Sequence, residues 1–180
     1  MTTENPVSNF ASSKSPSNLE FALAAAEAAA NTRCHNVVVM DLRGRSPVTE
    51  FFVIATGTSA RQMRTVADEV SDLGKHLNFK AWQKSGYESA RWILVDFVHV
   101  VVHVFDPDSR AFYDLEMLWG DAPRIDWRAE LGLPPATPEE LAPVATDGLA
   151  GLDEGGWEET PETDLAADAG HDDYLAESPT

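Results

Sequence analysis

The longest run of strand-forming residues covers residues 92–105, and it constrains the fold more than any other stretch. Its fourteen residues are almost all Trp, Ile, Val and Phe, which favour strands. A single strand of that length would exceed the usual maximum of about 10 residues. The run therefore predicts two consecutive strands, with a bend near residues 96–99.

The first of these strands divides its side chains between two faces. Trp92, Leu94 and Asp96 alternate onto one face, while Ile93 and Val95 point to the other. The Ile-Val face is the better core. We therefore expect the face that carries the Trp and the Asp to be only partly covered.

A short helix is expected directly after the second strand. Asp106-Pro107-Asp108-Ser109 breaks the apolar run, and either Asp108 or Ser109 is expected to cap the helix. Tyr113 and Glu116 fall on the flank of this helix. Four residues at three- and four-residue spacing are expected to face the core: Phe112, Leu115, Leu118 and Trp119.

The upstream sequence alternates helices with strands. Ser17 and Glu20 form a capping-box pattern before an Ala-Leu run, so a helix begins there. Apolar, β-branched runs at 37–42 and 51–55 predict buried strands, and residues 79–82 predict a short third one. Between them, Ser59 begins a second helix, with Gln62 in a capping-box position and a buried face of Met63, Val66, Ala67, Val70, Leu73 and Leu77. This order predicts an α/β fold with a mixed β-sheet and flanking helices.

The negative charge lies mainly at the C-terminal end. Residues 134–180 hold 13 of the 30 acidic residues and no Lys or Arg, so residues 1–133 carry 17 acidic and 13 basic residues. We expect a disordered N-terminal segment (1–16), a folded domain (17–120), a surface extension (121–135) and an acidic disordered tail (136–180). The charge disfavours binding to nucleic acid, which needs clustered Lys and Arg.

The single cysteine, Cys34, allows no intramolecular disulfide and suits a reducing cytoplasm. The sequence has no apolar run long enough to span a membrane and no secretory signal. We therefore expect a cytoplasmic protein without a membrane partner.

Three motifs are candidate sites of catalysis or metal binding. The Gly57-Thr58-Ser59 turn could hold a phosphate at a helix N-terminus, but a glycine turn with a helix cap explains it better. Asp41, Asp96 and Asp106 lack the Asp-x-Asp strand pattern of a Mg²⁺ site. His99 and His103 lie about 13 Å apart on a strand, too far to share one metal. We predict no enzyme activity, no cofactor and no metal.

Aromatic residues supply the fourth candidate site. Trp92 and Tyr113 can reach the same partly covered surface beside Asp96, and Trp119 is near. Large aromatics beside a charge are typical anchors of protein interfaces. Ordinary packing at the edge of a core explains them equally well on residue types alone.

Two long blocks, VVVMDLRGRSPVTEFFVIATGTSARQ and SARWILVDFVHVVVHVFDPDSRAFYDLEMLW, closely resemble the ribosomal silencing factor family, also called Iojap-like or RsfS proteins. The resemblance covers about residues 22–119. Ser85 before Gly86 and the apolar turn at 97–99 depart from the family pattern, so the loop contacts and the hairpin bend are expected to differ.

The resemblance implies a nucleotidyltransferase-like fold without the catalytic carboxylates. It also implies a translational repressor that binds the large ribosomal subunit through large-subunit ribosomal protein fourteen, blocks joining of the small subunit, and takes part in large-subunit assembly. The partner-contacting Trp, Tyr and Asp of the family carry over to Trp92, Tyr113 and Asp96, and we add Glu116 from the same helix flank. An active nucleotidyltransferase or nucleotide-binding enzyme remains the alternative, and a homodimer is a third interpretation.

Overall fold

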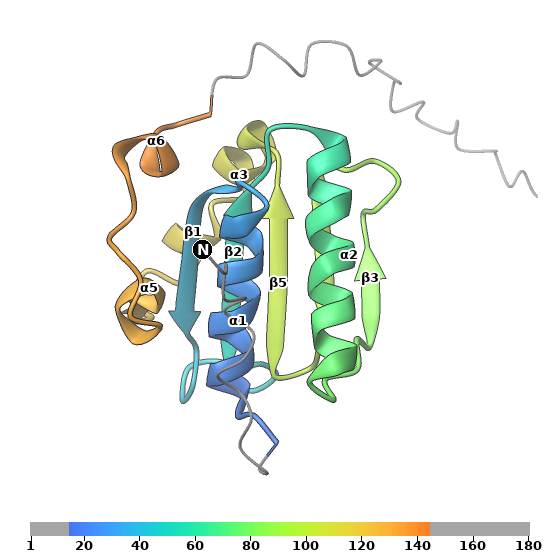
Figure 1. Ribbon diagram of the computed structural model, residues 1–180, viewed down its shortest axis with the longest axis vertical. Helices are drawn as coiled ribbons and strands as arrows, with labels where there is room; N and C mark the ends of the chain where they lie inside the picture. Colours follow the sequence, from blue (N-terminus) through green and yellow to red (C-terminus); the bar gives the residue numbers. More distant parts are fainter. Residues whose placement is uncertain (1–14, 145–180) are drawn as a thin grey trace, which may run out of the picture.

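The computed structural model describes residues 15–144 and has an α/β architecture (Figure 1). Six strands form one sheet: β1 (His35–Asp41), β2 (Phe51–Thr56), β3 (Gln83–Ser85), β4 (Trp92–Asp96), β5 (Val100–Phe105) and β6 (Arg124–Ile125). The helices are α1 (Asn18–Asn31), α2 (Ala60–His76), α3 (Pro107–Tyr113), α4 (Leu115–Leu118), α5 (Trp127–Glu130) and α6 (Pro138–Leu141). The predicted mixed sheet with flanking helices is confirmed.

The strand order is β3-β4-β5-β2-β1-β6, and only the central pair, β2 and β5, runs parallel. The predicted hairpin is present: β4 and β5 are antiparallel, and Trp92 lies opposite Phe105. The bend falls at residues 97–99, where the Asp96 Oδ1 accepts from the Val98 N–H at 2.6 Å and Val98 takes a φ of 73°. A carboxylate that binds the turn backbone is what ends β4.

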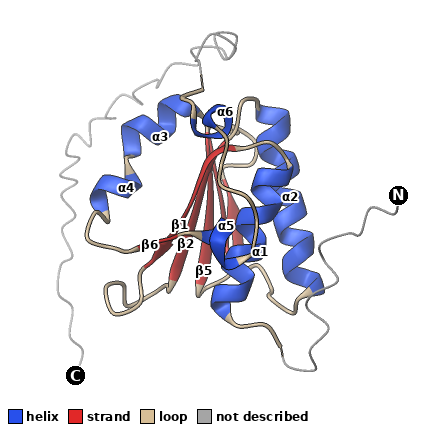
Figure 2. Cartoon of the chain, turned by 60° about the vertical axis from the view of Figure 1, so that its left-hand side comes forward, coloured by secondary structure: helices blue, strands red, loops and turns tan. Residues whose placement is uncertain are grey.

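Helices α1 and α2 cover one face of the sheet (Figures 1 and 2). The Ser17–Glu20 capping box that starts α1 is confirmed, with both reciprocal bonds present. At α2, Ser59 caps the helix as predicted, but the Gln62 side chain accepts from Thr58 N–H and not from the cap residue. The main core fills this interface with apolar side chains of both helices and of the central strands.

Helices α3 and α4 lie on the opposite face of the sheet (Figure 2), over a much smaller core. Asp106 caps α3, and neither of the predicted residues does so; its Oδ1 accepts from Ser109 N–H at 2.6 Å. The prediction that Phe112 and Leu118 face the core is wrong, because they are 81% and 70% exposed. The helix breaks at Asp114, whose φ of 37° lies in the left-handed region, so the helical spacing does not continue across it.

The prediction of a short strand at residues 79–82 is wrong. After α2 ends, Asn78 takes a φ of 64°, and Phe79 N–H donates to the carbonyl of Gly74. The Phe79 ring turns inward and stacks on Phe21, with 4.3 Å between ring centroids. Trp82, placed in that strand by its residue type, is 78% exposed.

The C-terminal extension lies along the outer edge of β1. Strand β6 pairs with Val39 and Met40, and the Trp127 indole N–H donates to the Val37 carbonyl at 3.0 Å. Helix α6 belongs to the segment assigned to the acidic tail, yet it contacts β1, so packed structure continues past residue 135. Residues 145–180 and 1–14 of the predicted terminal segments lie outside the described residues.

Candidate functional site

Trp92 is held at the border of the partly covered sheet face. Its ring stacks on Phe105 at 4.9 Å between centroids, and its indole N–H donates to the His103 Nδ1 at 3.2 Å. Gly86 fixes the backbone beside it: with a φ of 74°, a Cβ added there would lie 1.8 Å from the Trp92 carbonyl oxygen. Trp92 is therefore a rigid and still partly exposed aromatic.

Tyr113 meets Trp92 as the sequence predicts, with 4.6 Å between ring centroids. Phe112 packs edge-on against Tyr113 at 5.0 Å, so three aromatic rings from β4 and α3 form one group, called here the aromatic patch (Trp92, Phe112 and Tyr113). Met117 and Leu118 on α4 are also highly exposed. Sequence reasoning missed the exposure of Phe112 because it assumed one continuous helix.

An ion pair links the two short helices α3 and α4. Arg110 on α3 pairs with Glu116 on α4, and both side chains are mostly covered. The same guanidinium donates to the Asn36 carbonyl and to the Thr56 hydroxyl, both at 2.7 Å. Glu116, predicted as a contact residue, thus ties α4 through Arg110 to the sheet.

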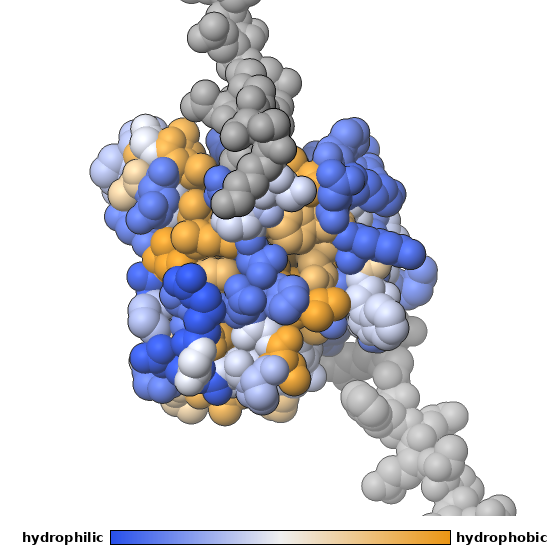
Figure 3. Space-filling model, turned by 90° about the horizontal axis from the view of Figure 1, so that it is seen from below, coloured by the Kyte–Doolittle hydropathy of each residue, from blue (hydrophilic) through white to orange (hydrophobic). Residues whose placement is uncertain are grey.

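Asp96 lies at the other end of β4 from Trp92, on the rim of an open hollow of about 550 Å³. The hollow lies on the partly covered sheet face. Seen from below, the molecule shows apolar residues at the surface among hydrophilic ones (Figure 3). Its most exposed lining residues are Val48, Trp82 and Val98. Side chains of four strands or strand-connecting loops form the rest: Ser46, Thr49, Phe52, Leu94, Val101 and His103, with Trp119 beside them.

His103 lines the hollow and contacts Trp92 of the aromatic patch. It is 4% exposed, and its ring contacts Phe52 edge-on at 4.6 Å between centroids. Burial lowers the pKa of His103 to about 3, so the ring is neutral at neutral pH. His99 lies in the exposed turn, 3.2 Å from the Glu50 carboxylate.

The candidates for phosphate binding have local structural roles. Gly57 N–H donates to the Phe105 carbonyl at 2.8 Å, and Thr58 N–H donates to the Gln62 Oε1 at 2.6 Å. A Cβ at Gly57 would lie 2.3 Å from the Met63 Cγ, so the glycine is needed for close packing. The N–H groups of Gly57 and Thr58 are therefore already engaged within the fold.

The carboxylates of Asp41, Asp96 and Asp106 are also engaged locally. Arg43 donates to both oxygens of Asp41 and lowers the pKa of that carboxyl. Asp96 and Asp106 bind turn and helix N–H groups. Within residues 15–144, no group of three or more His, Cys, Asp or Glu could hold a metal ion. Burial raises the pKa of the Cys34 thiol to about 12, which excludes a reactive thiolate at neutral pH.

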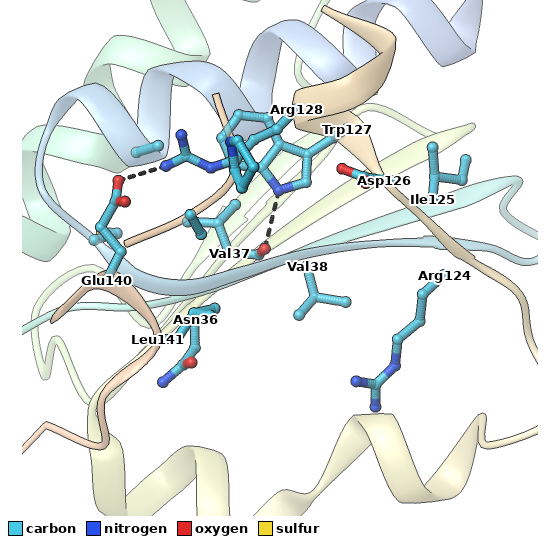
Figure 4. Close-up of a pocket in the computed structure, with 14 residues that line it drawn as sticks. Asn36, Val37, Val38, Arg124, Ile125, Asp126, Trp127, Arg128, Glu140 and Leu141 are labelled. Atoms are coloured by element: carbon cyan, nitrogen blue, oxygen red, sulfur yellow. Dashed lines mark hydrogen bonds and ion pairs between the residues drawn. The ribbon is translucent and has the colours of Figure 1, made fainter. Parts of the chain in front are cut away.

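A second pocket, of about 270 Å³, lies where the extension meets β1 (Figure 4). Its two labelled contacts are structural: Trp127 reaches the Val37 carbonyl, and Arg128 pairs with Glu140 of α6. These bonds anchor the extension to the sheet edge. None of the helices in residues 15–144 is long and apolar enough to cross a membrane.

Comparison with known proteins identifies the family. Residues 15–147 match the family described as "Ribosomal silencing factor during starvation". A ribosomal silencing factor RsfS from Halalkalibacterium halodurans is 39% identical over 110 residues, which is 61% of this chain and 94% of that protein. One from Bacillus subtilis is 40% identical over 102 residues, 57% of this chain and 86% of that protein.

A solved structure agrees with this assignment. A crystal structure of a protein from Chromobacterium violaceum is 32% identical, covers 58% of this chain and 88% of that chain, and superposes with a TM-score of 0.57. Because the family match spans well over half of the sequence, the chain belongs to the ribosomal silencing factor family.

Proposed function

We propose that this protein represses translation by binding the large ribosomal subunit through large-subunit ribosomal protein fourteen and sterically blocking joining of the small subunit. The names of the relatives support a silencing function at the ribosome. The observation that carries the proposal is the aromatic patch, in which Trp92 and Tyr113 lie in contact and remain partly exposed. The site of action is the cytoplasm, and a role in large-subunit assembly would use the same surface.

The action requires binding alone, without a chemical step. The Gly57 and Thr58 N–H groups are engaged within the fold, which argues against a nucleotidyltransferase that would use this turn for a phosphate. The Asp41 and Asp96 carboxylates each serve a neighbouring group and do not form a shared site. We therefore propose a non-enzymatic factor without a cofactor.

Four residues are proposed to support the contact, and they do so in three ways. Trp92 and Tyr113 supply aromatic surface that the partner would bury, and binding energy concentrates in such residues. Asp96 presents a carboxylate at the rim, where it favours a basic protein surface. Glu116 acts on the contact through Arg110, because the pair fixes α4 next to the patch.

The expected magnitude follows from interface energetics. A standard interface buries about 800 Å² per partner. Truncating one central aromatic costs about 2 kcal/mol or more, which is about thirtyfold in affinity. A loss of that size would abolish silencing at limiting protein concentration.

Co-sedimentation with purified large ribosomal subunits tests the proposal. Tyr113→Ala and Trp92→Ala should each bind about thirtyfold more weakly and should permit small-subunit joining. Leu141→Ala is the matched control, because Leu141 is an exposed apolar residue on α6 at the edge of β1. If both aromatic variants bound and blocked joining as wild type does, the site assignment would fail.

A homodimer is a second candidate, favoured by the exposed side chains of Phe112, Met117 and Leu118. An exposed apolar group of this kind, here on two successive short helices, is a typical self-association surface. Light scattering after size exclusion would detect the dimer. If the protein is monomeric at tens of micromolar concentration, the homodimer is excluded and the ribosomal proposal is unaffected.

A further inference from the structure

His103 has an unusual environment for a polar side chain. It lies on β5 with its ring packed among Phe52, Trp92 and Phe105, and it lines the 550 Å³ hollow. The ring is 4% exposed. Native proteins rarely bury a polar atom without a partner, so each exception calls for an explanation.

The Trp92 hydrogen bond determines which ring nitrogen of His103 carries the proton. An indole N–H can only donate, so the His103 Nδ1 at 3.2 Å must accept. The neutral ring then carries its single hydrogen on Nε2. Within the described part of the chain, this buried Nε2 has no hydrogen-bond partner. His103 therefore holds one oriented donor beside the hollow.

We infer that His103 is a specificity-determining residue of the partner surface, and that its Nε2–H takes a backbone carbonyl oxygen from an apolar segment of the partner protein seated in the hollow. This inference rests on the proposed function and names the chemistry that the same surface recognises. The Trp92–His103 bond places a lining residue of the hollow in contact with the aromatic patch. One partner segment can therefore cover both.

The lining of the hollow selects against other ligands. Phe52, Leu94 and Val101 give it an apolar wall, which suits apolar side chains. The ring of His103 is neutral, so it offers no charge to a phosphate or a carboxylate. Asp96 at the rim repels both of these anions. A peptide carbonyl is the neutral acceptor that every protein segment carries.

Access to the covered nitrogen requires a small movement of the wall. Trp119 lines the hollow, packs on Phe52 at 6.0 Å and remains partly exposed. It follows α4, a four-residue helix without a single buried residue, so few contacts oppose its displacement. Rotamer changes of this kind are common when interfaces form.

The test measures binding of purified large ribosomal subunits by His103→Phe, which keeps an aromatic ring and removes the donor. We expect about tenfold weaker binding, because the partner carbonyl is left without a donor. His103→Gln, which restores a side-chain N–H donor, should recover part of the affinity. His76→Phe is the matched control: this histidine is exposed at the end of α2, on the other side of the sheet.

Folding must be measured alongside binding, since a merely structural histidine would change both together. His103→Phe removes the acceptor of the Trp92 indole N–H together with the unpaired Nε2 donor, so its free energy of unfolding should fall somewhat. Affinities are therefore compared per folded molecule, which urea unfolding of each variant gives. Nitrogen NMR of the free protein should find the hydrogen of His103 on Nε2. Addition of isolated large-subunit ribosomal protein fourteen should shift the resonance of this Nε2–H proton downfield.

The outcomes separate the two proposals. If wild type binds large subunits and His103→Phe binds equally well, this inference alone fails. A free protein with the hydrogen on Nδ1 would also overturn it. If wild type itself does not bind large subunits, the proposed function fails and the inference fails with it.

Discussion

Acidification from pH 7 to pH 5 is expected to destabilise the fold through His103. Burial lowers its pKa from 6.5 to about 3 in the folded protein. The unfolded chain therefore takes up the proton first, so the free energy of unfolding falls as the pH drops below about 6.5. This loss continues to about pH 3, where the folded state is protonated as well.

The size of the effect follows from linkage. One unit of pKa difference corresponds to about 1.4 kcal/mol. Between pH 7 and pH 5, protonation of His103 favours the unfolded state by almost one and a half times this value. The free energy of unfolding therefore falls by about 2 kcal/mol. The carboxyls of Asp41 and Asp68 have pKa values below their usual range, so they act at lower pH and outside this interval.

Urea unfolding at pH 7 and pH 5 measures the loss directly. Wild type should lose about 2 kcal/mol more than His103→Phe over this interval, because the variant has no group to titrate there. The other histidines are common to both proteins and cancel in the difference. An equal loss in the two proteins would refute the assignment of a neutral, buried ring.

Three further predictions test how the site is positioned. Gly86→Ala should lower the free energy of unfolding by more than about 2 kcal/mol, because its Cβ would overlap the Trp92 carbonyl; unchanged urea unfolding would contradict this. Glu116→Gln should cost about 2–3 kcal/mol by leaving the Arg110 charge poorly paired. Thermal melting would show it, and a melt equal to that of wild type would contradict it. Trp127→Phe should cost about 1 kcal/mol by leaving the Val37 carbonyl without its donor. Hydrogen exchange in β1 should rise, and unchanged exchange would rule out this edge contact.

Local rules in the sequence were enough to predict most elements and half of the candidate site. The Ser17–Glu20 capping box begins α1 because its signal is contained within four residues. The alternation along β4 places Trp92 and Asp96 on the partly covered face, since a strand's period of two needs no knowledge of its neighbours. The bend in the long apolar run follows from strand length alone.

The errors arise where one residue's backbone or a distant partner decides the structure. Asp114 adopts a left-handed conformation that its residue type permits but does not require, and this exposes Phe112. Glu116 turns toward Arg110, whose other partners come from β1 and β2, and spacing in the sequence carries no trace of that. The role of His103 depends on a diagonal contact with Trp92 across the hairpin.

The two faces of the sheet differ in how much core they bury. Helices α1 and α2 bury the larger core, while α3 and α4 leave the other face partly open. Aromatic side chains on an element that packs weakly can be changed without unfolding the domain, and they can shift to meet a partner. Phe112→Ala should therefore weaken binding of large subunits while leaving urea unfolding within about 0.5 kcal/mol of wild type. A variant that lost stability and affinity together would show that the patch belongs to the core and is not a surface for a partner.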